Sequence, residues 1–113
     1  MLTIDAQVHC YERNHPGRPW TAVLAGPPEV TGPDMIKAMD AVGVDGAILH
    51  PPSWDNGSNE MAIDAAVKYP GKFCIMGWFP LNDPSQRPRI DTWLQRPGMV
   101  GLRWALTRPE PVP

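Results

Sequence analysis

The fold is decided between residues 33 and 50, which read PDMIKAMDAVGVDGAILH. The first part of this stretch carries apolar residues at the spacing of one helical face, namely Met35, Ile36, Met39 and Val42. Pro33 suits the first turn of such a helix and Gly43 suits its C-terminal end. The apolar run from Gly46 to Leu49 follows at once and is typical of a buried strand. A helix that leads directly into a buried strand is one unit of an α/β fold.

The same alternation continues on both sides of this unit. Three further apolar runs suit buried strands, at Leu2–Val8, Phe73–Phe79 and Met99–Leu102. Because each run is separated from the next by a stretch with helical spacing, we predict four parallel strands joined by three helices.

Two more helices complete this pattern. One follows the candidate caps Ser58 or Asn59, ends at Pro70-Gly71, and has the apolar face Ala62, Ala65, Ala66 and Tyr69. The other begins near Pro88, ends at Pro97-Gly98, and has the apolar face Ile90, Trp93 and Leu94.

Fifteen prolines would indicate disorder if they were spread through the chain, but they gather in loops after the predicted strands. Residues 16–29 form a long first loop, and residues 105–113 form a proline-rich tail or a truncated loop. The tail supplies no helix to cover the last strand. We therefore expect residues 1–113 to be the N-terminal portion of one incomplete (β/α)8 barrel domain, which would need about 250 residues to close.

Charge and composition exclude several classes of partner. A net charge of −2 without a run of either sign gives no basis for binding nucleic acid or an anionic membrane. The apolar runs are far shorter than the roughly 20 residues of a membrane span, and Met1–Asp5 lacks the features of a signal peptide. The expectation is a cytoplasmic protein in which Cys10 and Cys74 stay reduced.

Candidate site residues fall where the predicted strands end. Gln7 and His9 are two residues apart and so share one side of the first strand, with Asp5 a layer deeper as a structural acceptor. His50 ends the second strand, where it could exchange a proton or simply pack against the following prolines. Arg103 ends the fourth strand, where it could hold a substrate carboxylate or pair with a loop acid. Parallel strands bring these ends to one rim.

The loops after the strands are rich in tryptophan and lack nucleotide-binding motifs. Four tryptophans lie in or beside these loops, namely Trp20, Trp54, Trp78 and Trp104. Aromatic walls commonly enclose flat ligands, so we expect a planar organic substrate with Trp20 and Trp78 beside it. No phosphate-binding loop, dinucleotide fingerprint or serine-hydrolase elbow is present in the sequence.

Four motifs in order give the chain a family resemblance. They are Ile4-Asp5-Ala6 with Val8-His9, Gly43-Val44-Asp45-Gly46-Ala47-Ile48-Leu49, Tyr69-Pro70-Gly71-Lys72-Phe73, and Gly101-Leu102-Arg103. Together they resemble the amidohydrolase-related family, close to its lactonase branch. The resemblance implies a (β/α)8 barrel hydrolase that opens a lactone or related carboxylated ring by water attack on a carbonyl.

The same resemblance implies roles for the first strand. Metal-dependent members use a His-x-His pair there, but Gln7 replaces the first histidine and only His9 matches. An amide is a poor zinc ligand, so we expect no tightly bound zinc and favour the metal-free mode. In that mode His9 helps to polarise the ring carbonyl and a later aspartate, beyond residue 113, activates water. His15 lies in the first loop and is expected to be solvated.

Two alternatives to an enzyme remain at this point. The chain alone is expected to be inactive, and it could be a catalytically silent barrel half that binds a small molecule and covers its open edges by self-association or by pairing with the missing half. It could also be a flavodoxin-like module without a catalytic role.

Overall fold

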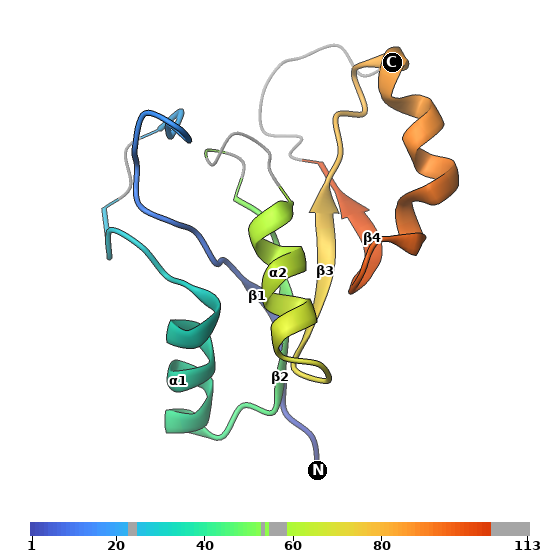
Figure 1. The fold of residues 1–113 in the computed structure, drawn as a ribbon. Helices are drawn as coiled ribbons and strands as arrows, with labels where there is room; N and C mark the ends of the chain where they lie inside the picture. The colour runs from blue at the N-terminus through green and yellow to red at the C-terminus, as the bar shows by residue number, and fades with distance from the viewer. Residues whose placement is uncertain (23–24, 53, 55–58, 105–113) are drawn as a thin grey trace.

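The sheet is parallel throughout and keeps its strands in chain order. In the computed structural model, which describes residues 1–22, 25–52, 54 and 59–104, the strands are β1 (Ile4–Val8), β2 (Gly46–Leu49), β3 (Phe73–Trp78) and β4 (Met99–Arg103). Each strand pairs in parallel with the next (Figure 1). A flavodoxin-like sheet has a different strand order, with its second strand at one edge, so the flavodoxin-like alternative is wrong.

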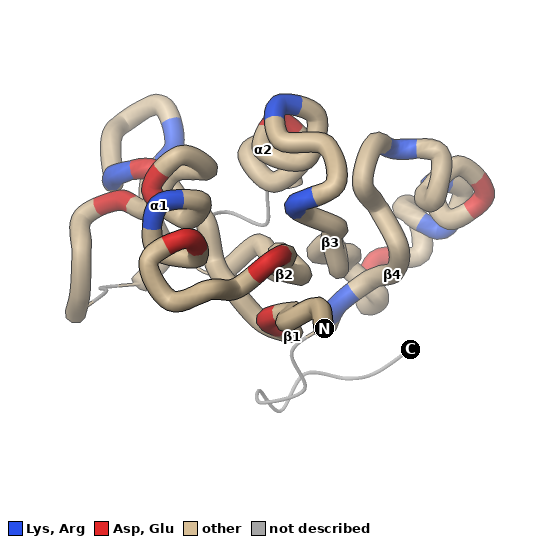
Figure 2. Tube along the Cα trace, turned by 90° about the horizontal axis from the view of Figure 1, so that it is seen from below, with Lys and Arg blue, Asp and Glu red and all other residues tan. Residues whose placement is uncertain are grey.

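The helices all cover one face of this sheet. They are α1 (Gly32–Val42), α2 (Glu60–Lys68) and the 3-10 helix η1 (Pro84–Gln95), and Figure 2 shows them on the same side of the strands. Strands in sequential order with every crossover helix outside them form a (β/α)8 barrel wall. The described chain therefore forms four strands and three helices of an incomplete (β/α)8 barrel.

Local sequence signals explain α1. The Thr31 side chain accepts a hydrogen bond from the Asp34 backbone and the Asp34 side chain accepts one from the Thr31 backbone, a reciprocal capping box. Gly43 ends the helix with a left-handed φ of 76°, which a side chain would disfavour. Met39 is buried as predicted, but Val42 is 76% exposed, so its place on the buried face was wrong. Val42 lies in the last turn of α1, where its side chain no longer faces the sheet.

The second helix also matches its predicted face. Ala62 and Ala65 are buried, and small side chains there let α2 approach the sheet closely. Asn59 stands at the N-cap position as predicted, but its backbone is helical and its side chain makes no cap hydrogen bond. The other candidate, Ser58, lies outside the described residues.

The third helix departs from its prediction. Trp93 is buried, but Ile90 is 47% and Leu94 is 67% exposed, so the predicted three-residue apolar face was wrong. A 3-10 helix has three residues per turn, so Leu94, which follows Trp93 directly, lies off the line of Trp93, whereas this geometry does not explain the exposure of Ile90. Pro88 lies inside this helix and has no N–H to donate to a regular α-helical ladder.

The core lies between the sheet and the helices. Leu49, Ile75 and Phe79 are the largest fully buried side chains. Trp93 reaches the sheet because Gly77 lies beneath it: a Cβ at Gly77 would come within 2.6 Å of the Trp93 ring. The Trp93 indole N–H donates to the carbonyl of Gly101, 2.8 Å away.

The first strand is less buried than predicted. Four of its five residues are exposed, and Ile4 is 52% exposed, so burial on both faces was wrong for this strand. Among the described residues β1 pairs only with β2, and its other edge is open. This apolar edge, with Leu2 at 76% exposure, supports the expectation of self-association, which stays a prediction.

The surface shows no concentration of one charge. Basic and acidic residues are interspersed over the described part of the chain (Figure 2). No helix in the described ranges is both long and apolar enough to cross a bilayer. The predicted tail at 105–113 lies outside the described residues.

Candidate active site

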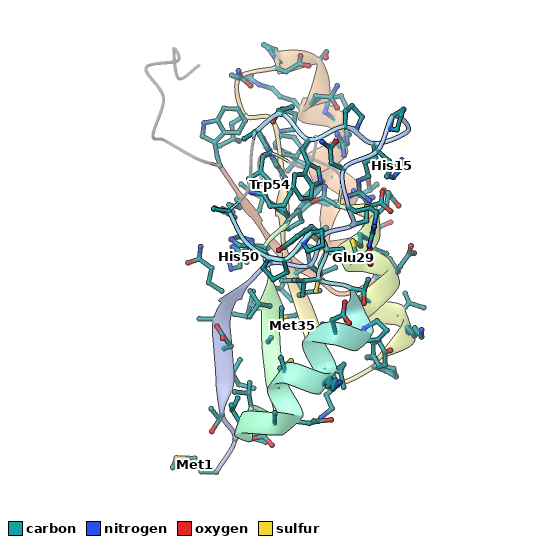
Figure 3. The ribbon with its side chains drawn as sticks, turned by 90° about the vertical axis from the view of Figure 1, so that its left-hand side faces the viewer. Met1, His15, Glu29, Met35, His50 and Trp54 are labelled. Carbon is teal, nitrogen blue, oxygen red and sulfur yellow. The ribbon has the colours of Figure 1, made fainter. Side chains whose placement is uncertain are left out.

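The carboxyl ends of the four strands bring the predicted site residues to one rim. His9 follows the buried Val8, His50 follows the buried Leu49, and Trp78 lies between the buried Gly77 and Phe79. Because side chains alternate along a strand, these three point to the sheet face opposite the helices. In Figure 3, Met1 lies at one end of the molecule, His50 lies near the carboxyl ends of the strands, and Trp54 and His15 lie in the loops beyond.

A bulge in β4 brings Arg103 to the same face. Ile75 pairs with Met99 but Met76 pairs with Gly101, so Val100 is an extra residue in the ladder. After Val100, each side chain of β4 therefore points to the face opposite to the one that regular alternation would give. As a result Arg103 pairs with Trp78 and shares its open face.

The first two rim residues are joined by a short hydrogen bond. Nδ1 of His9 lies 2.6 Å from the carbonyl oxygen of His50. A carbonyl oxygen can only accept, so Nδ1 of His9 carries the hydrogen. In the neutral ring Nε2 is then unprotonated, with a lone pair that can accept a proton or bind a metal ion.

The His50 ring is held by the first strand. Its Nε2 lies 2.9 Å from the carbonyl oxygen of Ala6 and therefore donates to it. Its Nδ1 is buried without a hydrogen-bond partner. The pKa of His50 is lowered, mainly by burial and further by the positive charges of Arg103 and His9, although the Ala6 hydrogen bond acts in the opposite direction. The ring is therefore neutral in the folded chain near pH 7.

A second bulge lies where the His50 ring meets β1. Asp5 pairs with Ala47 and Val8 with Leu49, so β1 holds one residue more than β2 over this interval. The alternation that placed Asp5 a layer below Gln7 and His9 is broken, and that prediction was wrong. Asp5 is nevertheless a structural acceptor as predicted, with its carboxylate 3.0 Å from the backbone N–H of Gln7.

Arg103 has an unsatisfied guanidinium. No hydrogen bond or ion pair joins its side chain to another described residue, and its Nη1 is buried without an acceptor. The predicted alternative, an ion pair with a loop acid, is therefore not found in the described part of the chain. A partly buried cation with free donors is suited to a carboxylate ligand.

The third strand contributes an aromatic pair to the rim. Trp78 and Trp104 pack edge to face with ring centroids 4.5 Å apart. The buried amide of Asn59 holds the backbone of Trp78 on both sides, accepting from its N–H at 2.7 Å and donating to its carbonyl at 3.1 Å. Sequence reasoning missed this role because an asparagine before a helix is most simply read as a cap.

The other two loop tryptophans form a separate aromatic cluster. Trp20 and Trp54 pack together with Tyr11 at centroid distances of 4.7 to 5.9 Å. The indole N–H of Trp20 donates to the carbonyl of Glu12. His15 is exposed as expected, with Nε2 3.1 Å from the Glu12 carboxylate. This cluster joins the first loop to the second, and the role of Trp20 beside a substrate stays a prediction.

The described residues do not form a metal site on their own. No group of three or more histidine, cysteine and acidic side chains comes together among them. His9 is oriented as metal-binding histidines commonly are, because its Nδ1 donates to a carbonyl oxygen and its Nε2 carries no hydrogen in the neutral ring. Gln7 is exposed beside it and offers only a weakly coordinating amide. These two described donors do not by themselves fit a zinc ion.

The cysteines are both free. Cys10 is buried, and burial together with the nearby Asp34 carboxylate raises the pKa of its thiol to about 12. Such a thiol stays protonated and acts as a small apolar core residue.

The fold and the rim together define a parallel barrel wall with polar side chains at the carboxyl ends of its strands, where barrel enzymes place their active sites. No family model matches the chain, and no curated protein matches it. Among solved structures it is similar to a probable 2-pyrone-4,6-dicarboxylic acid hydrolase from Acinetobacter baumannii, crystallised with citric acid bound. That likeness has a TM-score of 0.68 and 22% sequence identity. It covers 96% of this chain and 42% of the other, so this chain spans less than half the length of that hydrolase.

Proposed function

We propose that the chain contributes part of the active site of an amidohydrolase-superfamily hydrolase that opens a lactone or a related small carboxylated ring. The observation that carries the proposal is the rim itself, where an Arg103 guanidinium without a partner among the described residues shares one sheet face with a His9 ring whose Nε2 is open. The likeness to a probable lactone hydrolase whose structure holds a small carboxylate supports it.

The proposed substrate contacts follow from the chemistry of each side chain. Arg103 offers a planar fork of donors for a ring carboxylate. Trp78 offers an aromatic wall for the ring, and Gln7 offers an amide beside His9. In the reaction water adds to the ring carbonyl carbon, the bond from that carbon to the ring oxygen breaks, and the product carries a carboxyl and a hydroxyl group.

The role of His9 depends on which of its two ring nitrogens carries the hydrogen. Polarising a carbonyl needs a hydrogen on Nε2, whereas the neutral ring keeps its hydrogen on Nδ1 because Nδ1 donates to His50. We therefore propose that His9 takes a proton from the attacking water through Nε2, rather than polarising the carbonyl. We also propose that the reaction needs no tightly bound zinc, because Gln7 stands where a second histidine would be required.

The test uses 2-pyrone-4,6-dicarboxylate as probe, with binding followed by calorimetry and ring opening by loss of the pyrone absorbance. Because the chain alone is expected to be inactive, both are measured with residues 1–113 as part of a complete barrel. Arg103→Ala should weaken binding about tenfold to a hundredfold, since a hydrogen bond to a charged group contributes about 1.5–3 kcal/mol. The control is Arg87→Ala, which removes an exposed arginine from η1 and should change nothing.

A second pair of variants separates the two roles of His9. His9→Gln places an amide donor near the position of Nε2 but cannot take a proton, so ring opening should be lost while binding stays. Retained turnover in His9→Gln would instead favour carbonyl polarisation. Binding without turnover in the unaltered protein would favour the catalytically silent alternative, and absence of both would overturn the proposal.

A further inference from the structure

His50 is tied to β1 in two directions at once. Its carbonyl oxygen accepts from Nδ1 of His9 at 2.6 Å, and its own ring donates from Nε2 to the carbonyl of Ala6 at 2.9 Å. The backbone adds a third link, since the His50 N–H donates to the carbonyl of Val8. These three bonds join the residue that follows β2 to the last part of β1 and to His9.

We infer that His50 is a positioning residue, which fixes the end of β1 through Ala6 and thereby holds His9 in the form with Nδ1–H and an open Nε2. This replaces the expectation that His50 exchanges a proton with substrate. The catalytic role of Nε2 of His9 rests on the proposed function. The tautomers inferred for His9 and His50 do not depend on it.

The bulge in β1 shows why such a residue is needed. The extra residue between Asp5 and Val8 interrupts the regular ladder with β2, and Ala6 lies inside the interrupted interval. An interrupted ladder leaves backbone groups without their usual strand partners and lets the strand move. The His50 ring gives the Ala6 carbonyl a donor, three residues before His9.

The surroundings of the His50 ring restrict it to one neutral form. Nε2 carries the hydrogen that Ala6 accepts, and Nδ1 is buried without a partner. A second hydrogen on Nδ1 would be a buried donor without an acceptor, close to the charges of Arg103 and His9. Nε2 is thus bound to the Ala6 carbonyl and Nδ1 is shielded by burial, so neither nitrogen is offered to a ligand.

The inference predicts that the two rim histidines hold opposite tautomers. His9 carries its hydrogen on Nδ1, and His50 carries its hydrogen on Nε2. The third histidine is an internal reference, because Nδ1 of His15 accepts from the Gly17 N–H and its Nε2 faces the Glu12 carboxylate. In its neutral form His15 should therefore match His50 and differ from His9.

The experiment measures imidazole 15N chemical shifts of the full chain above the pH range where histidines titrate. With three histidines in the chain, each ring can be assigned by single substitution. The expected result is an Nδ1–H form for His9 alone and Nε2–H forms for His15 and His50. A His9 ring with its hydrogen on Nε2, or a His50 ring with its hydrogen on Nδ1, would overturn the inference even if the His50 variants do not fold, since substitution of His9 and of His15 assigns all three rings.

Variants then test whether His50 acts through His9. In His50→Ala, checked for folding by its amide spectrum, His9 should show a mixture of both tautomers, whereas His50→Gln, which restores a side-chain donor near Nε2, should return His9 to the Nδ1–H form. His15→Ala is the matched control and should leave His9 unchanged. A folded His50→Ala chain with an unchanged His9 tautomer contradicts the positioning role.

Turnover of 2-pyrone-4,6-dicarboxylate separates this inference from the proposed function. If the protein is a hydrolase, His50→Ala should lower kcat about tenfold or more with little change in KM, because loss of an orienting partner typically costs about 10- to 100-fold. If the protein shows no turnover, the proposed function fails while the tautomers remain measurable.

Discussion

In β3 the side chains alternate between buried and half-buried positions over six residues, whereas in β1 the first four residues are all exposed. Both strands run in the same direction and both begin with apolar residues. The difference lies in their neighbours, since β3 has a strand on each side and β1 has only β2 among the described residues. Burial of a strand is thus a property of the sheet position, and the strand's own sequence predicts it only in part.

The largest expected effect compares the same residue type in the two strands. Ile75→Ala should lower the free energy of unfolding by about 2–5 kcal/mol, because Ile75 is fully buried and its loss leaves a cavity. Ile4→Ala should lower it by less than about 1 kcal/mol, because about half of the Ile4 side chain already meets water. Urea unfolding measures both, and equal losses would remove the contrast between the strands.

A smaller effect concerns how the ends of the strands are held. Asn59→Ala should lower the free energy of unfolding by about 2–3 kcal/mol, since it leaves two backbone groups of Trp78 without their amide partner. Asn14→Ala is the matched control. Asn14 also accepts from a tryptophan N–H, that of Trp20, but it is exposed, so its loss should cost only about 0.5–1 kcal/mol. A control loss as large as that of Asn59 would show that burial is not what matters.

The smallest effect is the pH dependence at the end of β1. The pKa of His50 is lowered from 6.5 in the folded chain, so the unfolded chain takes up the proton first as the pH falls. The His50 contribution to stability is complete above about pH 6.5 and is lost as the pH falls below it toward the folded-state pKa. The difference in urea midpoint between about pH 7.5 and 5.5 should shrink in His50→Gln. An unchanged difference would mean that His50 stays readily protonated in the folded chain.

The sequence was sufficient for the elements that depend on local signals. The bounds of β2 matched their prediction, and α1 ended at Gly43 because a glycine can take the left-handed conformation there. The parallel order followed from alternating strands and helices. Together these placed His9, His50 and Arg103 at the carboxyl ends of their strands, although their roles stay predictions.

Other features depend on contacts that no local pattern specifies. The bulges in β1 and β4 depend on how one strand pairs with another. The sequence therefore did not show that Asp5 falls out of alternation with Gln7 and His9, or that Arg103 points to the open face of the sheet. Asn59 could serve as a cap or hold a neighbouring loop, and only the packing of α2 against β3 decides between them. In η1 the three-residue turn takes Leu94, the neighbour of Trp93, off the line of Trp93 and leaves it exposed.

The extra residue in β4 means that the side of the sheet to which Arg103 points depends on one irregularity in strand pairing. With the bulge at Val100, Arg103 pairs with Trp78 on the open face and Leu102 packs toward the core. If Val100 instead took a regular place in the ladder, each residue after it would pair one position further along β3 and change face, so that Leu102 would stand opposite Trp78 in place of the guanidinium. The way in which two strands pair can therefore decide whether the same sequence presents a charged or an apolar side chain at the rim.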